Sequence, residues 1–202
     1  MNQQRYTNEK VVSMSDFRVF IGGSAGSITP ITTILSSLPD DYNLIITLVI
    51  HSSGGTKTSM NEAIASNCAL TVIEVSDKEI AKANTIYVAP GGYHLYVENK
   101  HSYSLSLDKK EHYSRPAIDL LFTSAAEVFG KYCIAILLSG ASEDGTEGLL
   151  NIKHHGGLTI VQSPESSQVD IMPQSAIDNG AATKVLTPLE ISRLLLEYHN
   201  RT

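Results

Sequence analysis

The chain has 202 residues, of which 42% are hydrophobic and 18% are charged, and its formal net charge is −6. At about 150 residues per domain, this length predicts one domain that is large enough to bury a core without disulfides or structural metals. The negative charge disfavours nucleic acids and anionic membrane surfaces as partners, because neither would be attracted over long range.

The composition also narrows the cellular setting. The two cysteines, Cys68 and Cys133, form no CxxC pair, which excludes a finger-type zinc site and argues against a disulfide scaffold. The apolar stretches are far shorter than the roughly 20 residues that cross a bilayer, and residues 1–12 lack a signal-peptide apolar run. We therefore expect a soluble cytoplasmic protein without membrane insertion.

The hydrophobic pattern alternates between strand-like and helix-like segments. Residues 1–16 show no periodicity, and we expect a disordered or loosely attached leader followed by a single domain over 17–202. In chain order, the patterns predict strand 17–21, helix 28–38, strand 44–50, helix 58–65, strands 70–75 and 85–89, a hairpin over 93–107, helix 117–129, strand 132–138, helix 146–154, strand 158–162 and helices 172–179 and 188–199. Thr187 is the expected N-cap of the last helix.

This alternation predicts a doubly wound α/β fold, in which a mainly parallel sheet carries helices on both faces and an antiparallel hairpin lies at one edge. Ligands of such folds bind at the carboxyl ends of the strands. The polar loops that follow three predicted strands, at 22–26, 51–55 and 139–145, are therefore the candidate functional segments.

The first of these loops contains a G-x-S-x-G motif. Gly22, Ser24 and Gly26 lie between a buried strand and a helix, which is the setting that a nucleophilic serine requires. Two alternatives remain for this motif: Ser24 only caps the helix, or the loop forms a phosphate cradle. The dinucleotide fingerprint G-x-G-x-x-G is absent.

The other two loops supply a base and a carboxylate. Among seven histidines, only His51 directly follows a buried strand, and Asp144 lies in the third loop just before a helix. Serine needs a histidine base that is oriented by a carboxylate, with serine and histidine atoms about 2.6–3.2 Å apart or slightly further in an unliganded site. Ser24, His51 and Asp144 could form such a triad, although Asp144 alone could be a simple N-cap.

Six motifs follow one another along the chain. They are IGGSAG at 21–26, His51 after its strand, IYVAPGGYHL at 86–95, RPAIDLLF at 115–122, LSGASEDGTEG at 138–148 and MPQSAI at 172–177. In this order and spacing they resemble the catalytic domain of the CheB-type protein-glutamate methylesterases of bacterial chemotaxis, and the resemblance spans about residues 17–199.

The resemblance implies a serine hydrolase that removes methyl groups from glutamate methyl esters on receptor signalling helices and that can also deamidate glutamines. It implies a triad of Ser24, His51 and Asp144, with an oxyanion hole from the backbone N–H groups of Ala25 and Ala141, and no metal or other cofactor. Arg115 and His94 also match family motifs. For Arg115, substrate binding and structural pairing are both open, and for His94 a structural role is favoured.

Several positions depart from the family pattern. Ala25 stands where threonine is usual, Ala141 where methionine is usual, and Gln174 where a basic residue is usual. Family members under phosphorylation control carry an N-terminal receiver domain, and the 16 residues before the first predicted strand are too few for one. We therefore expect a methylated receptor or another signalling protein as substrate, and a separate response-regulator protein as a candidate partner.

Two rival functions remain at the level of sequence. A non-catalytic signalling module would keep the fold and bind a partner, and a phosphate or nucleotide binder would use the loop at 22–27. The presence of all three triad residues argues against a pure binding module, because binding alone does not need them.

Overall fold

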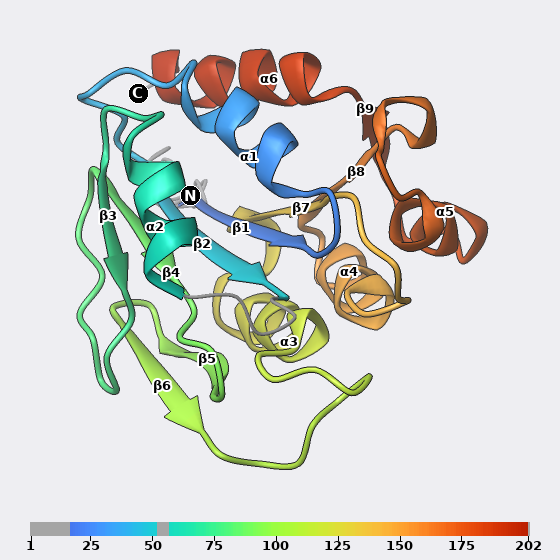
Figure 1. Ribbon diagram of the computed structural model, residues 1–202, viewed down its shortest axis with the longest axis horizontal. Coiled ribbons are helices and arrows are strands. Elements are labelled where there is room, and N and C mark those ends of the chain that lie inside the picture. Colours follow the sequence, from blue (N-terminus) through green and yellow to red (C-terminus); the bar gives the residue numbers. More distant parts are fainter. Residues whose placement is uncertain (1–16, 52–56, 202) are drawn as a thin grey trace, which may run out of the picture.

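The computed structural model describes residues 17–51 and 57–201, so the predicted leader and most of the predicted loop at 51–55 lie outside the described residues. Seven parallel strands form the main sheet, in the order β3-β4-β2-β1-β7-β8-β9 (Figure 1). The strands are β1 (Arg18–Gly23), β2 (Ile45–Ile50), β3 (Thr71–Glu74), β4 (Thr85–Val88), β7 (Cys133–Leu137), β8 (Leu158–Gln162) and β9 (Lys184–Leu186).

The sheet is doubly wound about β1. The chain passes from β1 to β2 and onward to the β3 and β4 side, and it later returns to β7 on the other side of β1. Strand order reverses at this point, and the loops after β1, β2 and β7 diverge at one edge of the sheet. Such a switch point is where doubly wound folds bind their ligands.

Helices cover both faces of the sheet (Figure 1). Along β1, Val19 and Ile21 point into one apolar cluster, and Phe20 points into the other, as the period of two in a strand requires. The first face carries α1 (Ile28–Leu35), α2 (Lys57–Ala65) and α6 (Pro188–Asn200), and the second carries α3 (Ile118–Phe129), α4 (Thr146–His154) and α5 (Ile171–Asp178).

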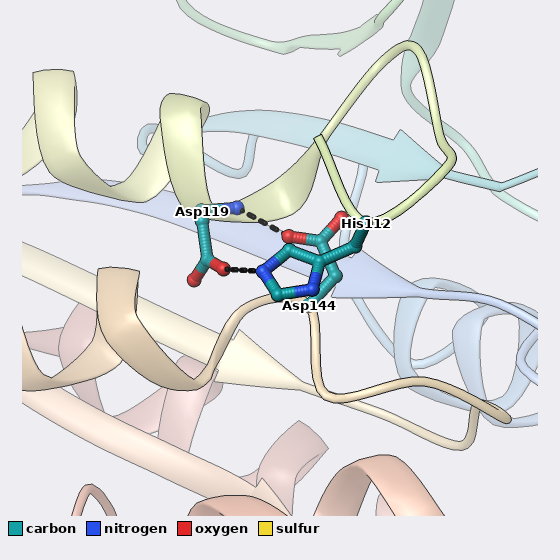
Figure 2. A group of neighbouring side chains, drawn as sticks. All are labelled: His112, Asp119 and Asp144. Carbon is teal, nitrogen blue, oxygen red and sulfur yellow. Dashed lines mark hydrogen bonds and ion pairs between the residues drawn. The ribbon is translucent and has the colours of Figure 1, made fainter. Parts of the chain in front are cut away.

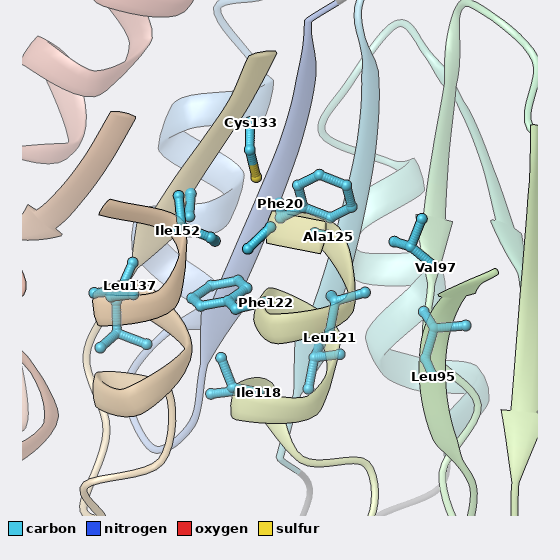
Figure 3. Close-up of a cluster of buried hydrophobic side chains, with 14 of the residues drawn as sticks. Phe20, Leu95, Val97, Ile118, Leu121, Phe122, Ala125, Cys133, Leu137 and Ile152 are labelled. Carbon is cyan, nitrogen blue, oxygen red and sulfur yellow. The ribbon is translucent and has the colours of Figure 1, made fainter. Parts of the chain in front are cut away.

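The hairpin packs against α3. Strands β5 (His94–Asn99) and β6 (Ser102–Ser106) are antiparallel and pair with each other as a separate two-stranded sheet. Leu95 and Val97 point toward Leu121 of α3 in the second cluster (Figure 3). The hairpin thereby fixes α3, whose N-terminus reaches the candidate site.

The sequence patterns predicted most of these elements. Helix α4 and strand β8 have the predicted bounds, and Thr187 is confirmed as the N-cap of α6, where Glu190 completes a capping box. Strand β9 was not predicted, because its three residues are mostly exposed and carry no apolar pattern. Among the described residues, no helix is long and apolar enough to span a membrane.

Gly148 provides a test of the contact between α3 and α4. A Cβ at this position would lie 2.5 Å from Phe122 Cβ and 3.0 Å from the backbone oxygen of Asp119. Alanine normally favours a helix over glycine, but here the neighbouring backbone cannot move away cheaply. We expect Gly148→Ala to lower the free energy of unfolding by about 1–3 kcal/mol in urea denaturation.

Gly180→Ala is the comparison variant. Gly180 has φ +68° with no heavy atom within 4 Å of an added Cβ, so only the left-handed backbone opposes alanine, at a cost of about 1–2 kcal/mol. A Gly148→Ala protein as stable as the wild type would contradict the close packing of α3 on α4.

Candidate active site

Ser24 and His51 follow two neighbouring strands. Gly23 of β1 pairs with Ile50 of β2, so the next residue of each strand lies at the same edge of the sheet. The His51 N–H donates to the Gly23 carbonyl at 3.0 Å and continues this ladder. An open cleft of about 370 Å³ lies here, and its lining residues are Ser24, Ala25, His51, Tyr113, Ser114, Ala141 and Ser142.

Two glycines permit the backbone to approach Ser24. Gly26 adopts φ +78°, which is a left-handed conformation that costs glycine little. Gly140 lies beside the serine, and an added Cβ there would be 3.0 Å from Ser24 Cβ and 2.6 Å from Met172 Cε. The Ser24 N–H donates to the Ser139 carbonyl at 2.9 Å. These contacts join the loop after β1 to the loop after β7.

Asp144 is buried where the third loop meets the N-terminus of α3. Its Oδ2 accepts the Ile118 N–H and its Oδ1 accepts the Asp119 N–H, both at 2.9 Å. The same Oδ2 lies 2.8 Å from His51 Nε2. Asp144 therefore does not cap the helix that follows it, α4, whose N-cap is Gly145. It caps α3, whose own N-cap residue, Ala117, has no side chain that could do so.

The charge of Asp144 is stabilised by these contacts. Burial alone would raise the pKa of the carboxyl, but His51 and the two backbone N–H groups outweigh burial and lower it below its usual value. The carboxylate is thus ionised at neutral pH, as an orienting group for an imidazole must be.

The two imidazole nitrogens of His51 face different residues. Nε2 faces Asp144, and Nδ1 lies 3.3 Å from Ser114 Oγ. Within the described chain, Ser24 Oγ makes no hydrogen bond to His51. Ser24 and His51 thus share one cleft, but His51 Nδ1 faces the hydroxyl of Ser114. For His51 to take a proton from Ser24, the Ser24 hydroxyl would have to replace that of Ser114 at Nδ1. Catalytic hydrogen bonds commonly tighten only when substrate binds.

The predicted oxyanion donors lie in the same cleft. Ala25 and Ala141 both line it, and no described residue accepts a hydrogen bond from either backbone N–H. The Ala25 carbonyl, by contrast, accepts the Ser139 hydroxyl at 2.8 Å, which fixes the peptide beside it. Two unengaged N–H groups next to a serine can bind an oxyanion.

The other two family-matched residues are found outside the cleft lining. Arg115 Nη1 donates to the carbonyls of Leu107 and Asp108, both at 2.8 Å, so the guanidinium holds the segment that follows the hairpin. His94 is buried, and its Nδ1 accepts the Ala117 N–H at 3.2 Å. Its Nε2 lies 2.9 Å from the Lys109 carbonyl, which matches the structural role favoured for it.

Sequence reasoning missed a second carboxylate at the site. Asp119 Oδ1 accepts the Gly148 N–H at 2.7 Å, and Asp119 Oδ2 lies 3.3 Å from His112 Nε2 (Figure 2). Burial raises the pKa of Asp119 to about 7, with the nearby Asp144 charge adding to the shift. Its position in the RPAIDLLF motif was the available signal.

His112, Asp119 and Asp144 also place three potential metal-ligand atoms within 4.8 Å of one another. We do not interpret this group as a metal centre. Each Asp144 oxygen already accepts a backbone N–H, and the Asp119 oxygens face Gly148 and His112. Hydrogen bonding within the protein therefore accounts for the cluster.

The fold and the cleft together define a class. A doubly wound α/β sheet presents a hydroxyl at its carboxyl edge, with an imidazole in the same cleft and a buried carboxylate behind the imidazole. This set of groups, at the ends of separate strands, is typical of serine hydrolases.

Comparisons with known proteins identify the family. The CheB methylesterase family model matches residues 19–195, so the chain belongs to this family of carboxylic ester hydrolases. A Leptospira interrogans protein named putative protein-glutamate methylesterase/protein-glutamine glutaminase is 36% identical over 178 residues, which are 88% of this chain and 92% of the relative.

A Thermotoga maritima relative named protein-glutamate methylesterase/protein-glutamine glutaminase is 34% identical over 89% of this chain and 53% of its own length. The chain thus spans about half of that relative. The crystal structure of the Thermotoga maritima CheB methylesterase catalytic domain matches with a TM-score of 0.85 and 34% identity, and covers 90% of this chain and 97% of that domain. The predicted doubly wound fold is confirmed.

The raised pKa of Asp119 predicts how stability depends on pH. The folded chain holds a proton on Asp119 up to about pH 7, whereas the unfolded chain releases it near 3.8. The stability that this proton contributes is fully present below about pH 4 and is lost as the pH rises to 7. We therefore expect the difference in free energy of unfolding, wild type minus Asp119→Asn, to decrease as the pH rises from 4 to 7.

Urea denaturation of both proteins across this pH range measures the difference. Asparagine keeps an acceptor for the Gly148 N–H and leaves the backbone bond to Asp144 intact. His112 and Asp144 face Asp119, and both remain in the variant. Parallel pH profiles for the two proteins would show that Asp119 does not titrate in this window.

Proposed function

We propose that this protein hydrolyses glutamate γ-methyl esters of a signalling protein through an acyl-enzyme on Ser24. The observation that carries the proposal is the shared cleft of Ser24 and His51, with His51 Nε2 2.8 Å from the buried Asp144 carboxylate. Family membership supports the reaction class, because the relatives above are named protein-glutamate methylesterases.

In the acylation step, Ser24 Oγ attacks the ester carbonyl and passes its proton to His51 Nδ1. Asp144 faces Nε2, holds the proton on that nitrogen and stabilises the imidazolium that forms. The negative charge on the carbonyl oxygen is bound by the N–H groups of Ala25 and Ala141. The carbon–oxygen bond to the methoxy group then breaks, and His51 returns the proton to release methanol.

Deacylation reverses the roles with water as the nucleophile. His51 Nδ1 takes a proton from water, the hydroxide attacks the acyl carbon, and the same two N–H groups stabilise the second oxyanion. The proton returns to Ser24 Oγ, and a free glutamate is released. Each lost oxyanion donor should slow turnover by about 10²–10³-fold.

Glutamine deamidation is a second reaction open to the same site. Attack on a side-chain amide forms the same acyl-enzyme and releases ammonia in place of methanol, and the relatives' names include glutaminase. Mass spectrometry separates the two, since demethylation removes 14 mass units and deamidation adds about one. We propose a methylated receptor or similar signalling protein as substrate, and a separate response regulator as a candidate control partner.

The cytoplasm is the proposed location. Cys68 and Cys133 are both free thiols, which is in keeping with a reducing compartment.

Loss of the Ser24 hydroxyl tests the nucleophile. We expect Ser24→Ala to reduce hydrolysis of a glutamate γ-methyl ester peptide by at least about 10³-fold and to abolish labelling by a fluorophosphonate probe. Methanol release and mass spectrometry of the labelled protein provide the two measurements.

Ser37→Ala is the matched control, because Ser37 is exposed beyond the end of α1. It should be labelled at the wild-type rate. Wild-type turnover by Ser24→Ala would refute the nucleophile assignment. A wild-type protein that neither hydrolyses the ester nor reacts with the probe would favour the non-catalytic module, and a thermal shift with nucleotides would favour the phosphate-binding alternative.

Asp144→Asn tests the orienting group. Asparagine keeps one acceptor oxygen, so one of the two backbone N–H groups that now reach the carboxylate loses its acceptor, and the neutral amide no longer stabilises an imidazolium. We expect turnover to fall on the order of 10³–10⁴-fold and stability to fall by about 1–3 kcal/mol. Ester hydrolysis and urea denaturation measure the two effects.

Glu143→Gln removes a neighbouring exposed carboxylate and should leave both quantities near wild type. If Asp144→Asn retained full turnover, His51 would not depend on this carboxylate.

A further inference from the structure

A tight turn over residues 111–114 forms one wall of the cleft. The Glu111 N–H donates to the Ser114 carbonyl at 3.2 Å, and the Ser114 N–H donates to the Glu111 carbonyl at 2.7 Å. The two central residues have positive φ angles, +47° for His112 and +62° for Tyr113. Such turns usually carry glycine, asparagine or aspartate at these positions, because other side chains are strained there.

The turn is anchored on both sides of Tyr113. His112 Nε2 lies 3.3 Å from Asp119 Oδ2, and Ser114 Oγ lies 3.3 Å from His51 Nδ1. These two contacts connect the turn to α3 and to the imidazole. The position of Tyr113 at the cleft is therefore fixed from within the site and does not depend on the tyrosine's own packing.

Tyr113 itself is 96% exposed, yet it lines the cleft beside Ser24 and His51. Its ring makes no aromatic contact with another described residue. A ring this exposed buries little apolar surface in the free protein. Exposed aromatic side chains of this kind are commonly anchors for a partner.

We propose that Tyr113 is a substrate-contacting residue that binds the polypeptide segment flanking the esterified glutamate. The inference rests on the proposed function, because it assumes that a glutamate side chain enters the cleft toward Ser24. The backbone that carries this side chain then remains at the rim, where the tyrosine ring can cover its apolar side chains. Tyr113 would thus determine preference for protein substrates and take no part in bond making.

The test compares two substrates. One is an amphipathic 20-residue peptide with a single glutamate γ-methyl ester, and the other is p-nitrophenyl acetate, which has no polypeptide to contact. We expect Tyr113→Ala to raise KM for the peptide about tenfold or more, with kcat changed little, and to leave kcat/KM for p-nitrophenyl acetate near wild type. Tyr113→Phe keeps the ring and should restore the peptide KM.

Tyr113→Gly separates binding from folding. Glycine accepts φ +62° freely, so this variant should be at least as stable as the wild type in thermal unfolding while showing the same peptide defect. Lys78→Gly is the matched control, because Lys78 has φ +63° and does not line the cleft. It should keep the wild-type KM for the peptide.

The outcomes are distinct. An unchanged peptide KM in Tyr113→Ala would overturn the proposal, as would an equal loss on both substrates, which would place Tyr113 in the chemistry. Wild type without activity on either substrate and without fluorophosphonate labelling would refute the proposed function, and the inference would fall with it.

Discussion

The rest of the site depends on the contacts that the buried carboxylate of Asp144 makes with the N-terminus of α3 and with His51. An ionised group inside a protein needs partners for its charge, and here they come from two other segments. The N-terminus of α3 contributes two N–H groups together with the positive end of its dipole, and the residue that follows β2 is His51, which contributes its imidazole. One carboxylate therefore fixes the loop after β7, the start of α3 and the imidazole relative to one another.

The contacts of Asp144 also shift the pKa values of two neighbouring carboxyl groups in opposite directions. Asp144 receives N–H donors and an imidazole, so its pKa is lowered, whereas Asp119 is buried near the Asp144 charge and its pKa is raised to about 7. Separation of two close carboxyl groups into one ionised and one neutral member is a common feature of active sites. Here Asp119, whose pKa is raised, supports the cleft wall through His112, and the ionised Asp144 faces His51.

The sequence allowed the strand-ending groups to be predicted because their signals are local. A buried apolar run followed by glycine and serine indicates the turn at Ser24, and a histidine directly after another such run indicates its neighbour in the sheet. The cap on α3 could not be read in this way, because Asp144 is 26 residues away from Ile118 along the chain. The only local sign was Ala117, an N-cap residue without a capping side chain.

The contacts of the turn at 111–114 were also beyond sequence reasoning. Nothing in its residue types indicates a tight turn, because neither central residue is glycine, asparagine or aspartate. Its side chains contact Asp119 and His51, and His51 is 63 residues away from Ser114 along the chain. The short strand β9 was not predicted for a different reason: it has only three residues, two of them are exposed, and it pairs with β8.

The departures from the family pattern gain a physical interpretation from this geometry. Ala25 and Ala141 stand where larger side chains are usual, and both line the cleft. Their N–H groups belong to the backbone, so the smaller side chains leave the proposed oxyanion donors in place and reduce the side-chain surface of the cleft wall. Tyr113 supplies an aromatic surface to the same cleft from the turn at 111–114. The residues proposed for the chemistry thus follow strands of the sheet and are held by buried contacts. The surface proposed to bind the polypeptide consists of the small side chains of Ala25 and Ala141 and the exposed ring of Tyr113.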